Sequence, residues 1–103
     1  MTELATSSTE DLAHVAASHR LVQPAGMPTG EQIRAARALL RWSAAQLARA
    51  AGVSWRSVQR AESAVGIPRM HTATLDAIRR ALEFEGIEFF QNSNGQGVRL
   101  RRR

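Results

Sequence analysis

The sequence predicts a mainly α-helical fold of four helices followed by a C-terminal β-hairpin. Between residues 31 and 85, apolar residues recur at intervals of three and four and are punctuated by residues that start or stop helices. From residue 87 the spacing changes to the alternation of a strand, and Asn94 with Gly95 suits a turn. A chain of 103 residues has room for one domain with a modest core.

Capping residues mark the starts of the first two helices. Thr29 followed three residues later by Gln32 is typical of a capping box, and it predicts a first helix that ends at about Arg41. Ser43 offers a second N-cap for a helix of about two turns, which stops at Gly52. The expected buried stripes of these two helices contain Ile33, Ala36, Leu40, Leu47, Ala48 and Ala51.

The third and fourth helices are bounded in the same way. Ser54 caps a third helix, which ends before Gly66 because glycine does not suit a helix interior. A fourth helix begins near Thr72 or Thr74 and stops at Gly86. The inward-facing residues of the two helices are expected to be Val58, Ala61, Leu75, Ile78, Ala81 and Leu82.

The C-terminal hairpin has strands predicted at residues 87–91 and 98–101. A two-stranded hairpin alone is barely stable in water, so we expect it to pack on the helices or to pair with a second copy of the chain through its free edge. Two interpretations remain open for its arginines: they reach phosphate, or they protect an edge strand from aggregation. These arginines are Arg99, Arg101, Arg102 and Arg103.

The charge of the chain is unevenly distributed. All 14 basic residues are arginines, and 13 of them lie with only six acidic residues in the segment 29–103. Residues 1–28 are acidic and rich in Ser, Thr and Ala, and we interpret them as a flexible N-terminal arm. The chain then divides into this arm, a helical domain at 29–86, and a hairpin with a basic tail at 87–103 that is a candidate dimerisation element. Arginine forms paired hydrogen bonds with phosphate and with guanine, which favours a nucleic-acid partner.

Composition also excludes several classes of protein. The absence of cysteine excludes disulfides, cysteine-ligated zinc and thiol catalysis. The three histidines share no metal-ligand spacing, and no nucleophile-base pair or phosphate loop is present, so we expect no metal, no cofactor and no enzymatic activity. No stretch of about 18 apolar residues and no secretory signal pattern occurs, so we expect no membrane association and a cytoplasmic, nucleoid-associated protein.

Residues 44–62 meet the requirements of two short helices that cross at a steep angle. Ala48 is small where the two backbones approach, and Gly52 tolerates the positive φ of the turn between them. Val53 and Val58 supply apolar side chains that fill the space after the turn. This combination predicts a helix-turn-helix.

The segment resembles the helix-turn-helix of the phage repressor and Cro-like (XRE-type) family of transcriptional regulators, over roughly residues 31–82. The resemblance implies a four-helix, lambda-repressor-like domain whose recognition helix, at about 54–63, enters the major groove of DNA. It also implies an ion pair between Arg37 and Glu62. The family's usual glutamine at the start of the second helix is Ala44 here, so one DNA contact is expected to be missing. The matching residues are Arg37, Leu47, Ala48, Ala51, Gly52, Val53, Ser54, Val58 and Glu62.

The resemblance places two sets of residues at the DNA. The expected base-reading residues are Trp55, Arg56, Gln59 and Arg60. Arginine can bind guanine and glutamine can bind adenine through paired hydrogen bonds, whereas Trp55 either contacts the DNA or packs on the domain surface. The expected phosphate contacts are Ser43, Gln46, Ser54, Ser57 and Arg69. Helix capping by the serines, and a solvated loop charge at Arg69, are the alternatives.

We therefore expect a sequence-specific, DNA-binding transcriptional regulator that acts on double-stranded DNA as a repressor, since the chain has no evident sensing or recruiting domain. One short helix reads few base pairs, so we expect a homodimer on a two-fold operator. The alternative is an antitoxin-type DNA-binding protein whose residues 1–28 bind a protein partner. The candidate dimer residues are Leu75, Ile78, Leu82, Phe89, Phe90, Val98 and Leu100.

Overall fold

The computed structural model describes residues 26–101. Most of the predicted N-terminal arm, and the end of the basic tail at Arg102 and Arg103, lie outside these residues. The last residues assigned to the arm belong to the packed domain. The side chain of Pro28 is fully buried, and Met27 packs against the core. The folded part of the chain therefore includes residues 27 and 28.

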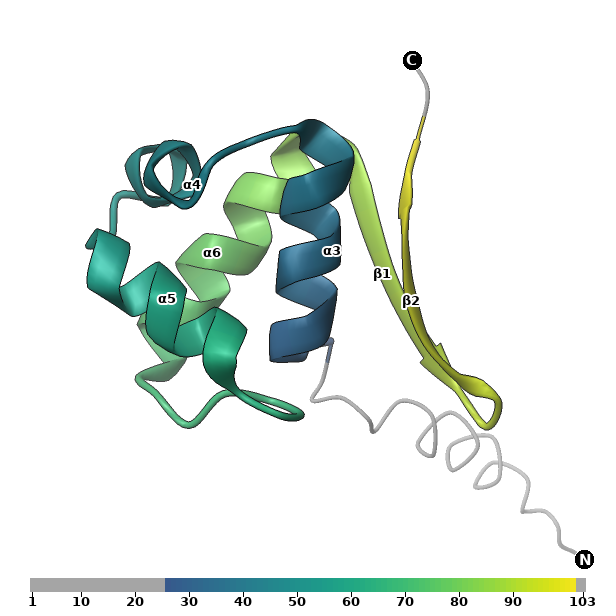
Figure 1. Ribbon diagram of the computed structural model, residues 1–103. Helices are drawn as coiled ribbons and strands as arrows, with labels where there is room; N and C mark the ends of the chain where they lie inside the picture. The colour runs from purple at the N-terminus through teal and green to yellow at the C-terminus, as the bar shows by residue number, and fades with distance from the viewer. Residues whose placement is uncertain (1–25, 102–103) are drawn as a thin grey trace, which may run out of the picture.

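Within residues 26–101, four helices precede a two-stranded hairpin, which confirms the predicted fold class (Figure 1). The helices are α3 (Gly30–Leu40), α4 (Ala44–Ala51), α5 (Trp55–Ser63) and α6 (Thr72–Phe84). The strands are β1 (Ile87–Asn92) and β2 (Gly95–Leu100). The second strand starts earlier than its alternation pattern predicted, because two of its first three residues are glycines and supply no side chains to alternate.

The helix ends follow the capping residues of the sequence. Thr29 and Gln32 form a complete capping box at the start of α3, and Ser43 and Gln46 form a second one at the start of α4. Gly52 ends α4 in the left-handed conformation, with φ 71°. Arg41 ends α3 in the same conformation, with φ 59°, although it is not a glycine. Its N–H donates a hydrogen bond to the carbonyl of Ala38. This carbonyl belongs to the last helical turn and has no partner within the helix.

The core lies between the four helices and the start of β1. Its members are fully or nearly fully buried: Ile33, Ala36, Leu47, Ala48, Val58, Ala61, Leu75, Ile78, Leu82 and Ile87. The prediction that Leu75, Ile78 and Leu82 form a dimer surface is therefore wrong, because these side chains are 3%, 0% and 0% exposed. A helix with one apolar stripe buries it against the nearest apolar surface. For α6 that surface is provided by helices of its own chain.

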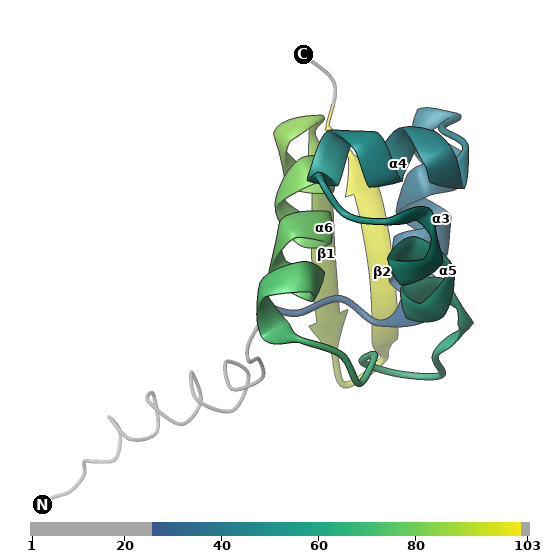
Figure 2. The same cartoon turned by 90° about the vertical axis from the view of Figure 1, so that its left-hand side faces the viewer.

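The hairpin packs on the helices of its own chain. Figure 2 shows the two strands behind the helical layer, where β1 contacts α6 and β2 contacts α3. The register pairs Ile87 with Leu100 and Phe89 with Val98, so these residues share the inward face. Phe89 and Val98 are half-buried against the core. Two of the hairpin's candidate dimer residues are thus part of the domain's own packing.

The outer face of the hairpin is closed by local contacts. Phe90 is paired with Gly97, and a Cβ added to Gly97 would lie only 2.7 Å from the Phe90 ring. The ring therefore covers the glycine. The guanidinium of Arg99 lies 6.0 Å from the centre of the same ring, at the limit of a cation–π contact. The other candidate dimer residues on the hairpin are Phe90, which is 45% exposed on this face, and Leu100, which is 37% exposed at the end of the inward face.

Gln32 joins the start of α3 to the hairpin. Its side-chain N–H groups donate to the carbonyls of Phe90 (3.0 Å) and Gly97 (2.9 Å). Its side-chain oxygen accepts from the Thr29 N–H (3.0 Å) and from Gln91 (3.2 Å). Only 2% of Gln32 is exposed, so water cannot replace these bonds. One buried amide thus completes the capping box and also ties two strands to the helix.

Replacing Gln32 by alanine is expected to lower the free energy of unfolding by about 3 kcal/mol, because it leaves buried carbonyl and N–H groups without partners. The chain contains a matched control. Gln46 has the same place in the second capping box but is solvent-exposed, so Gln46→Ala is expected to cost less than about 1 kcal/mol. Urea unfolding monitored by circular dichroism measures both values. Equal losses for the two variants would contradict the role assigned to Gln32.

The hairpin also contains an acid-sensitive contact. Glu88 accepts hydrogen bonds from Arg99 (2.8 and 2.6 Å) and forms an ion pair with Arg101. The hydrogen bond from Arg99, with a contribution from Arg101, holds the pKa of Glu88 below its ordinary value of 4.5. Arg99 and Arg101 are thus paired with Glu88, and both interpretations offered for the hairpin arginines stay predictions.

Because the pKa of Glu88 is lower in the folded chain than in the unfolded chain, its stabilising effect is complete above pH 4.5. That effect is lost as the pH falls through the lowered pKa. The wild-type chain is therefore expected to have a higher melting temperature than Glu88→Gln at neutral pH, and the difference is expected to shrink below pH 4.5. Thermal unfolding of both proteins across this range measures the difference. A gap that stays constant in acid would show that the carboxylate does not contribute through its charge.

Candidate nucleic-acid interface

The helices α4 and α5 form a helix-turn-helix. In Figure 1, α4 is seen nearly along its axis while α5 runs across the view, so the two helices cross steeply. The N–H of Val53 donates to the carbonyl of Ala48 (3.0 Å), and Gly52 takes the left-handed conformation between them. Ala48 and Val58 are 5% and 0% exposed. Each residue has the position in the turn that its size and backbone freedom predicted.

The helix α5, which the sequence predicts to be the recognition helix, presents one buried and one exposed face. Val58, Ala61 and Glu62 are buried against the rest of the domain. All four predicted base-reading residues are exposed, and their positions place them on the opposite face: Trp55, Arg56, Gln59 and Arg60. Trp55 is 52% exposed, so about half of its surface is available to a partner. Four polar or amphipathic side chains thus share one solvent-facing stripe.

The predicted phosphate contacts cluster at the starts of α4 and α5. Ser43 caps α4 by accepting from the Gln46 N–H (3.1 Å), and the Gln46 side chain returns a bond to the Ser43 N–H (2.7 Å). Ser54 caps α5 by accepting from the Ser57 N–H (3.0 Å). The serines therefore act as helix caps, and contact with phosphate stays a prediction for all four residues. The start of each helix keeps further backbone N–H groups, which suit an anion.

Two other positions named from the sequence have clear places in the fold. Arg69 is exposed in the loop between α5 and α6. Ala44, at the position where the Cro-like family has a glutamine, is half-buried and packs against the core. The first residue of α4 therefore offers no polar side chain to a ligand.

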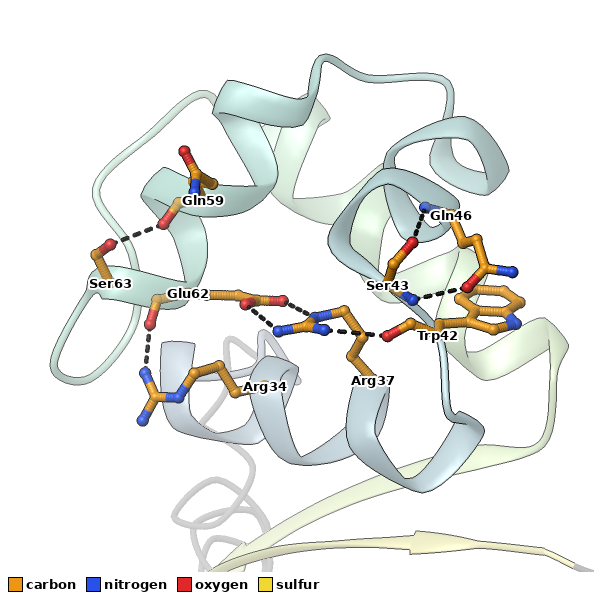
Figure 3. A network of polar contacts seen from close by, with 8 residues as sticks. All are labelled: Arg34, Arg37, Trp42, Ser43, Gln46, Gln59, Glu62 and Ser63. Atoms are coloured by element: carbon orange, nitrogen blue, oxygen red, sulfur yellow. Dashed lines mark hydrogen bonds and ion pairs between the residues drawn. The ribbon is translucent and has the colours of Figure 1, made fainter.

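Arg37 and Glu62 join α3 to α5 by a bidentate ion pair. The Nε and Nη2 atoms of Arg37 lie 2.6 and 2.9 Å from the two carboxylate oxygens of Glu62 (Figure 3). The Nη1 atom of Arg37 also donates to the carbonyl of Trp42 (3.0 Å), at the segment that leads into α4. Hydrogen bonding to Glu62 raises the pKa of Arg37 above its ordinary value. One guanidinium thus fixes both helices of the helix-turn-helix relative to α3.

The start of α3 holds the end of the recognition helix through contacts that the sequence did not predict. Arg34 donates to the backbone carbonyl of Glu62 (Figure 3). Gly30 lies so close that an added Cβ would be 2.6 Å from the carbonyl oxygen of Ala61. Its N–H donates to the carbonyl of Gly66 (2.9 Å). These contacts join residues about 30 positions apart in the sequence, so no local sequence pattern predicts them.

Apart from Arg34 and Arg37 on α3, the arginines of the described residues fall into two groups. On α6 and the hairpin, Arg79 and Arg80 pair with Asp76 and Glu83, while Arg99 and Arg101 pair with Glu88. Around the helix-turn-helix, five exposed arginines form no ion pair with any described residue: Arg41, Arg49, Arg56, Arg60 and Arg69. Between Ala44 and Ser63 the only acidic side chain is Glu62, which is buried and paired with Arg37.

This sorting of charge leaves the helix-turn-helix surface positive and the surface of α6 and the hairpin close to neutral. Unpaired arginines carry their full charge to an incoming ligand, whereas the paired ones are already neutralised by neighbouring carboxylates. A surface of exposed arginines beside two helix N-termini has the chemistry to bind a polyanion.

Residues 26–101 contain neither a candidate membrane-spanning helix nor a candidate metal-binding cluster. No helix there is long and apolar enough to cross a membrane. Nor does that part of the chain contain a group of three or more His, Cys, Asp or Glu residues that could hold a metal ion.

No protein-family model matches this chain, and comparison with curated proteins and with solved structures gives no match either. The resemblance to the Cro-like regulators thus rests on the residues quoted above, and membership of that family stays a prediction. Function has to be inferred from the geometry and charge of the surface itself.

Proposed function

We propose that this protein is a sequence-specific, DNA-binding transcriptional regulator that reads the major groove with α5. The observation that carries the proposal is a separation among the described arginines, since five exposed ones around the helix-turn-helix form no ion pair there while the four on α6 and the hairpin are matched with carboxylates. A solubility role alone would not require this separation. A negatively charged partner that binds across α4 and α5 accounts for it.

The side chains on the exposed face of α5 favour a double-stranded DNA partner. Arg56 and Arg60 can each form paired hydrogen bonds with a guanine edge, and Gln59 can do so with adenine. The caps at Ser43 and Ser54 orient the starts of α4 and α5, where backbone N–H groups can bind phosphate. In this arrangement the phosphate contacts position the domain, and three neighbouring side chains read the sequence.

We further propose that the protein binds as a homodimer and acts as a repressor. The exposed stripe of α5 contacts only a few base pairs, so one copy gives little discrimination within a genome. Two copies on a two-fold site double the number of bases read, with half-sites about one helical turn apart. A small domain bound at such a site would block access of other proteins to the same DNA.

Selection of bound sequences from a random duplex pool tests the proposal, followed by binding of the enriched site at several salt concentrations. We expect a short inverted repeat, and an affinity that falls with salt because bound phosphates release counterions. The discriminating result is the ratio between the enriched site and a scrambled duplex at one salt concentration. A ratio near one, with weak binding that disappears as salt rises, would mean that the surface attracts polyanions without reading sequence.

A further inference from the structure

The junction between α3 and α4 contains a residue in an unfavourable backbone conformation. Arg41 ends α3 with φ 59° and ψ 34°, and within residues 26–101 it is the only non-glycine residue with a positive φ. In this left-handed conformation a Cβ atom comes too close to a backbone carbonyl oxygen, so glycine adopts it much more readily than other residues. A glycine at position 41 would therefore end α3 with less strain.

The end of α4 has the same geometry with a glycine in place of the arginine. Gly52 has φ 71°, and its N–H and that of the next residue each donate to a carbonyl of the last helical turn (3.2 and 3.0 Å). The N–H groups of Arg41 and Trp42 do the same at the end of α3 (3.0 and 3.1 Å). Because the hydrogen bonds are equivalent, the arginine side chain is not needed to end the helix.

The side chain of Arg41 has no partner within the described part of the chain. It is exposed, and it forms no hydrogen bond or ion pair with any of residues 26–101. Strained backbone conformations are concentrated at positions where a ligand is bound. An exposed arginine kept in a conformation that suits glycine therefore indicates a contact with a molecule outside the folded chain.

Arg37 holds the junction in place through two contacts with Trp42. The backbone carbonyl of Arg37 accepts from the Trp42 N–H (3.1 Å), and its guanidinium donates to the Trp42 carbonyl (3.0 Å; Figure 3). The N–H of the next residue, Ser43, donates to the side chain of Gln46 (2.7 Å). The backbone that follows Arg41 is thus fixed before any ligand arrives, which reduces the entropy lost on binding.

The junction lies beside both helices of the helix-turn-helix. The guanidinium that contacts the Trp42 carbonyl also binds the carboxylate of Glu62, near the end of α5 (Figure 3). Ser43, two residues after Arg41, is the N-cap of α4. Ala44, the first residue of α4, offers no polar side chain to a ligand, and Arg41 is the exposed cation nearest to it in the sequence.

We propose that Arg41 binds a phosphate of the DNA backbone, and that its strained conformation is retained because it presents a guanidinium at this point. A helix in the major groove has a phosphate strand on either side, so a cation at the margin of the helix-turn-helix meets phosphate and not a base edge. The inference rests on the proposed function in that the ligand is double-stranded DNA. The contact anchors the domain and carries no sequence information.

Arg41→Gly tests the proposal because its two expected effects have opposite signs. The melting temperature is expected to rise by about 4 °C, since the left-handed strain is relieved. Affinity for a duplex is expected to fall at least about threefold, because a charge-assisted hydrogen bond is lost. The slope of log affinity against log salt concentration is expected to decrease by about one, since one fewer phosphate is neutralised. Wild-type affinity in this variant would overturn the proposal.

Two alanine variants assign the change in melting temperature to the backbone. Arg41→Ala removes the guanidinium but keeps a Cβ atom in the left-handed conformation, so we expect the same loss of affinity without the rise in melting temperature. Gly52→Ala is the converse, because no atom lies within 4 Å of a Cβ added there and only backbone strain is introduced. Its melting temperature is expected to fall by about 4 °C. Equal rises for Arg41→Ala and Arg41→Gly would contradict the role of strain.

Arg99→Ala is the control for net charge. It also removes one positive charge, but from a hairpin arginine that is 69% exposed and paired with Glu88. We expect this variant to keep the salt dependence of the wild-type chain. An equal decrease in slope for Arg99→Ala and Arg41→Gly would mean that the charge of Arg41 acts at a distance, without a phosphate contact, and the proposal would fail.

Fluorescence anisotropy with an enriched site and with a scrambled duplex of equal length separates this inference from the proposed function. Arg41→Gly is expected to weaken binding to both duplexes by the same factor, because phosphates are common to both. If the wild-type chain binds both duplexes equally and Arg41→Gly weakens both, sequence reading fails and the phosphate contact stands. If the wild-type chain prefers the enriched site and Arg41→Gly binds it equally well, the proposed function stands and this inference fails.

Discussion

Replacing both Arg56 and Arg60 by alanine is expected to weaken binding to the selected DNA site at least about 30-fold, with little change in the free energy of unfolding. Each paired contact between arginine and guanine is worth about 1–3 kcal/mol of discrimination. Both side chains are exposed and form no ion pair within the described residues, so the folded domain loses no ion pair there when they are removed. The loss should therefore fall on specific binding alone.

Arg99→Ala is the matched control for this experiment. It removes one exposed arginine from the hairpin, where the guanidinium is already paired with Glu88. Fluorescence anisotropy at a fixed salt concentration compares the affinities of the single variants, the double variant and the control. The control is expected to bind within a few-fold of wild type. Equal losses for Arg56→Ala and Arg99→Ala would mean that net charge, and not the stripe on α5, determines binding.

Replacing Arg37 by alanine is expected to lower the free energy of unfolding by about 3 kcal/mol, which corresponds to a fall of more than about 10 °C in melting temperature. The side chain of Glu62 is only 10% exposed, so its carboxylate would remain in the interior without a partner. The carbonyl of Trp42 would also lose its donor. Because the pair fixes α5 against α3, DNA binding is expected to weaken together with stability.

Arg79→Ala provides a control of nearly equal burial. The side chain of Arg79 is 24% exposed and that of Arg37 is 26% exposed, but the partners of Arg79 are more open to water, at 28% for Asp76 and 41% for Glu83. Water can solvate the carboxylates left by Arg79→Ala, so its cost is expected to stay below about 1 kcal/mol. Chemical denaturation of both variants measures the difference. Similar losses would show that the burial of Glu62 is not the source of the effect.

Local patterns predicted most of the elements that build the recognition surface. Each N-cap of α3, α4 and α5 is a Thr or Ser that binds the N–H three residues later. The same spacing of three relates the buried Val58 to Ala61, and the exposed Arg56 to Gln59, on the two faces of α5. Such features depend on side chains within one helical turn of each other, and for that reason the order of the residues reveals them.

Contacts between distant residues could not be predicted in this way. The stripe of Leu75, Ile78 and Leu82 indicated a buried face, but the same stripe suits a core and a dimer interface equally well. Gln32 was expected only as half of a capping box, although its side chain also binds the carbonyls of Phe90 and Gly97. The residues around Gly30 in the sequence did not predict its close approach to α5. For Gln32 and Gly30 the partner lies more than 25 residues away along the chain.

The sequence by itself determined the four helices, their caps, the turn at Gly52 and the side of α5 that faces solvent, because these depend on spacing and backbone freedom within a few residues. Asp76 and Glu83 lie three or four residues from Arg79 or Arg80, so their ion pairs also follow from helical spacing. Residues 29–103 hold 13 arginines and six acidic residues, and composition cannot say how the more distant ones meet. Only the tertiary structure decided that Glu88 neutralises Arg99 and Arg101 and that Glu62 is buried against Arg37. Charges separated along the chain interact only when folding brings them within a few ångströms, and this leaves the helix-turn-helix with its positive surface.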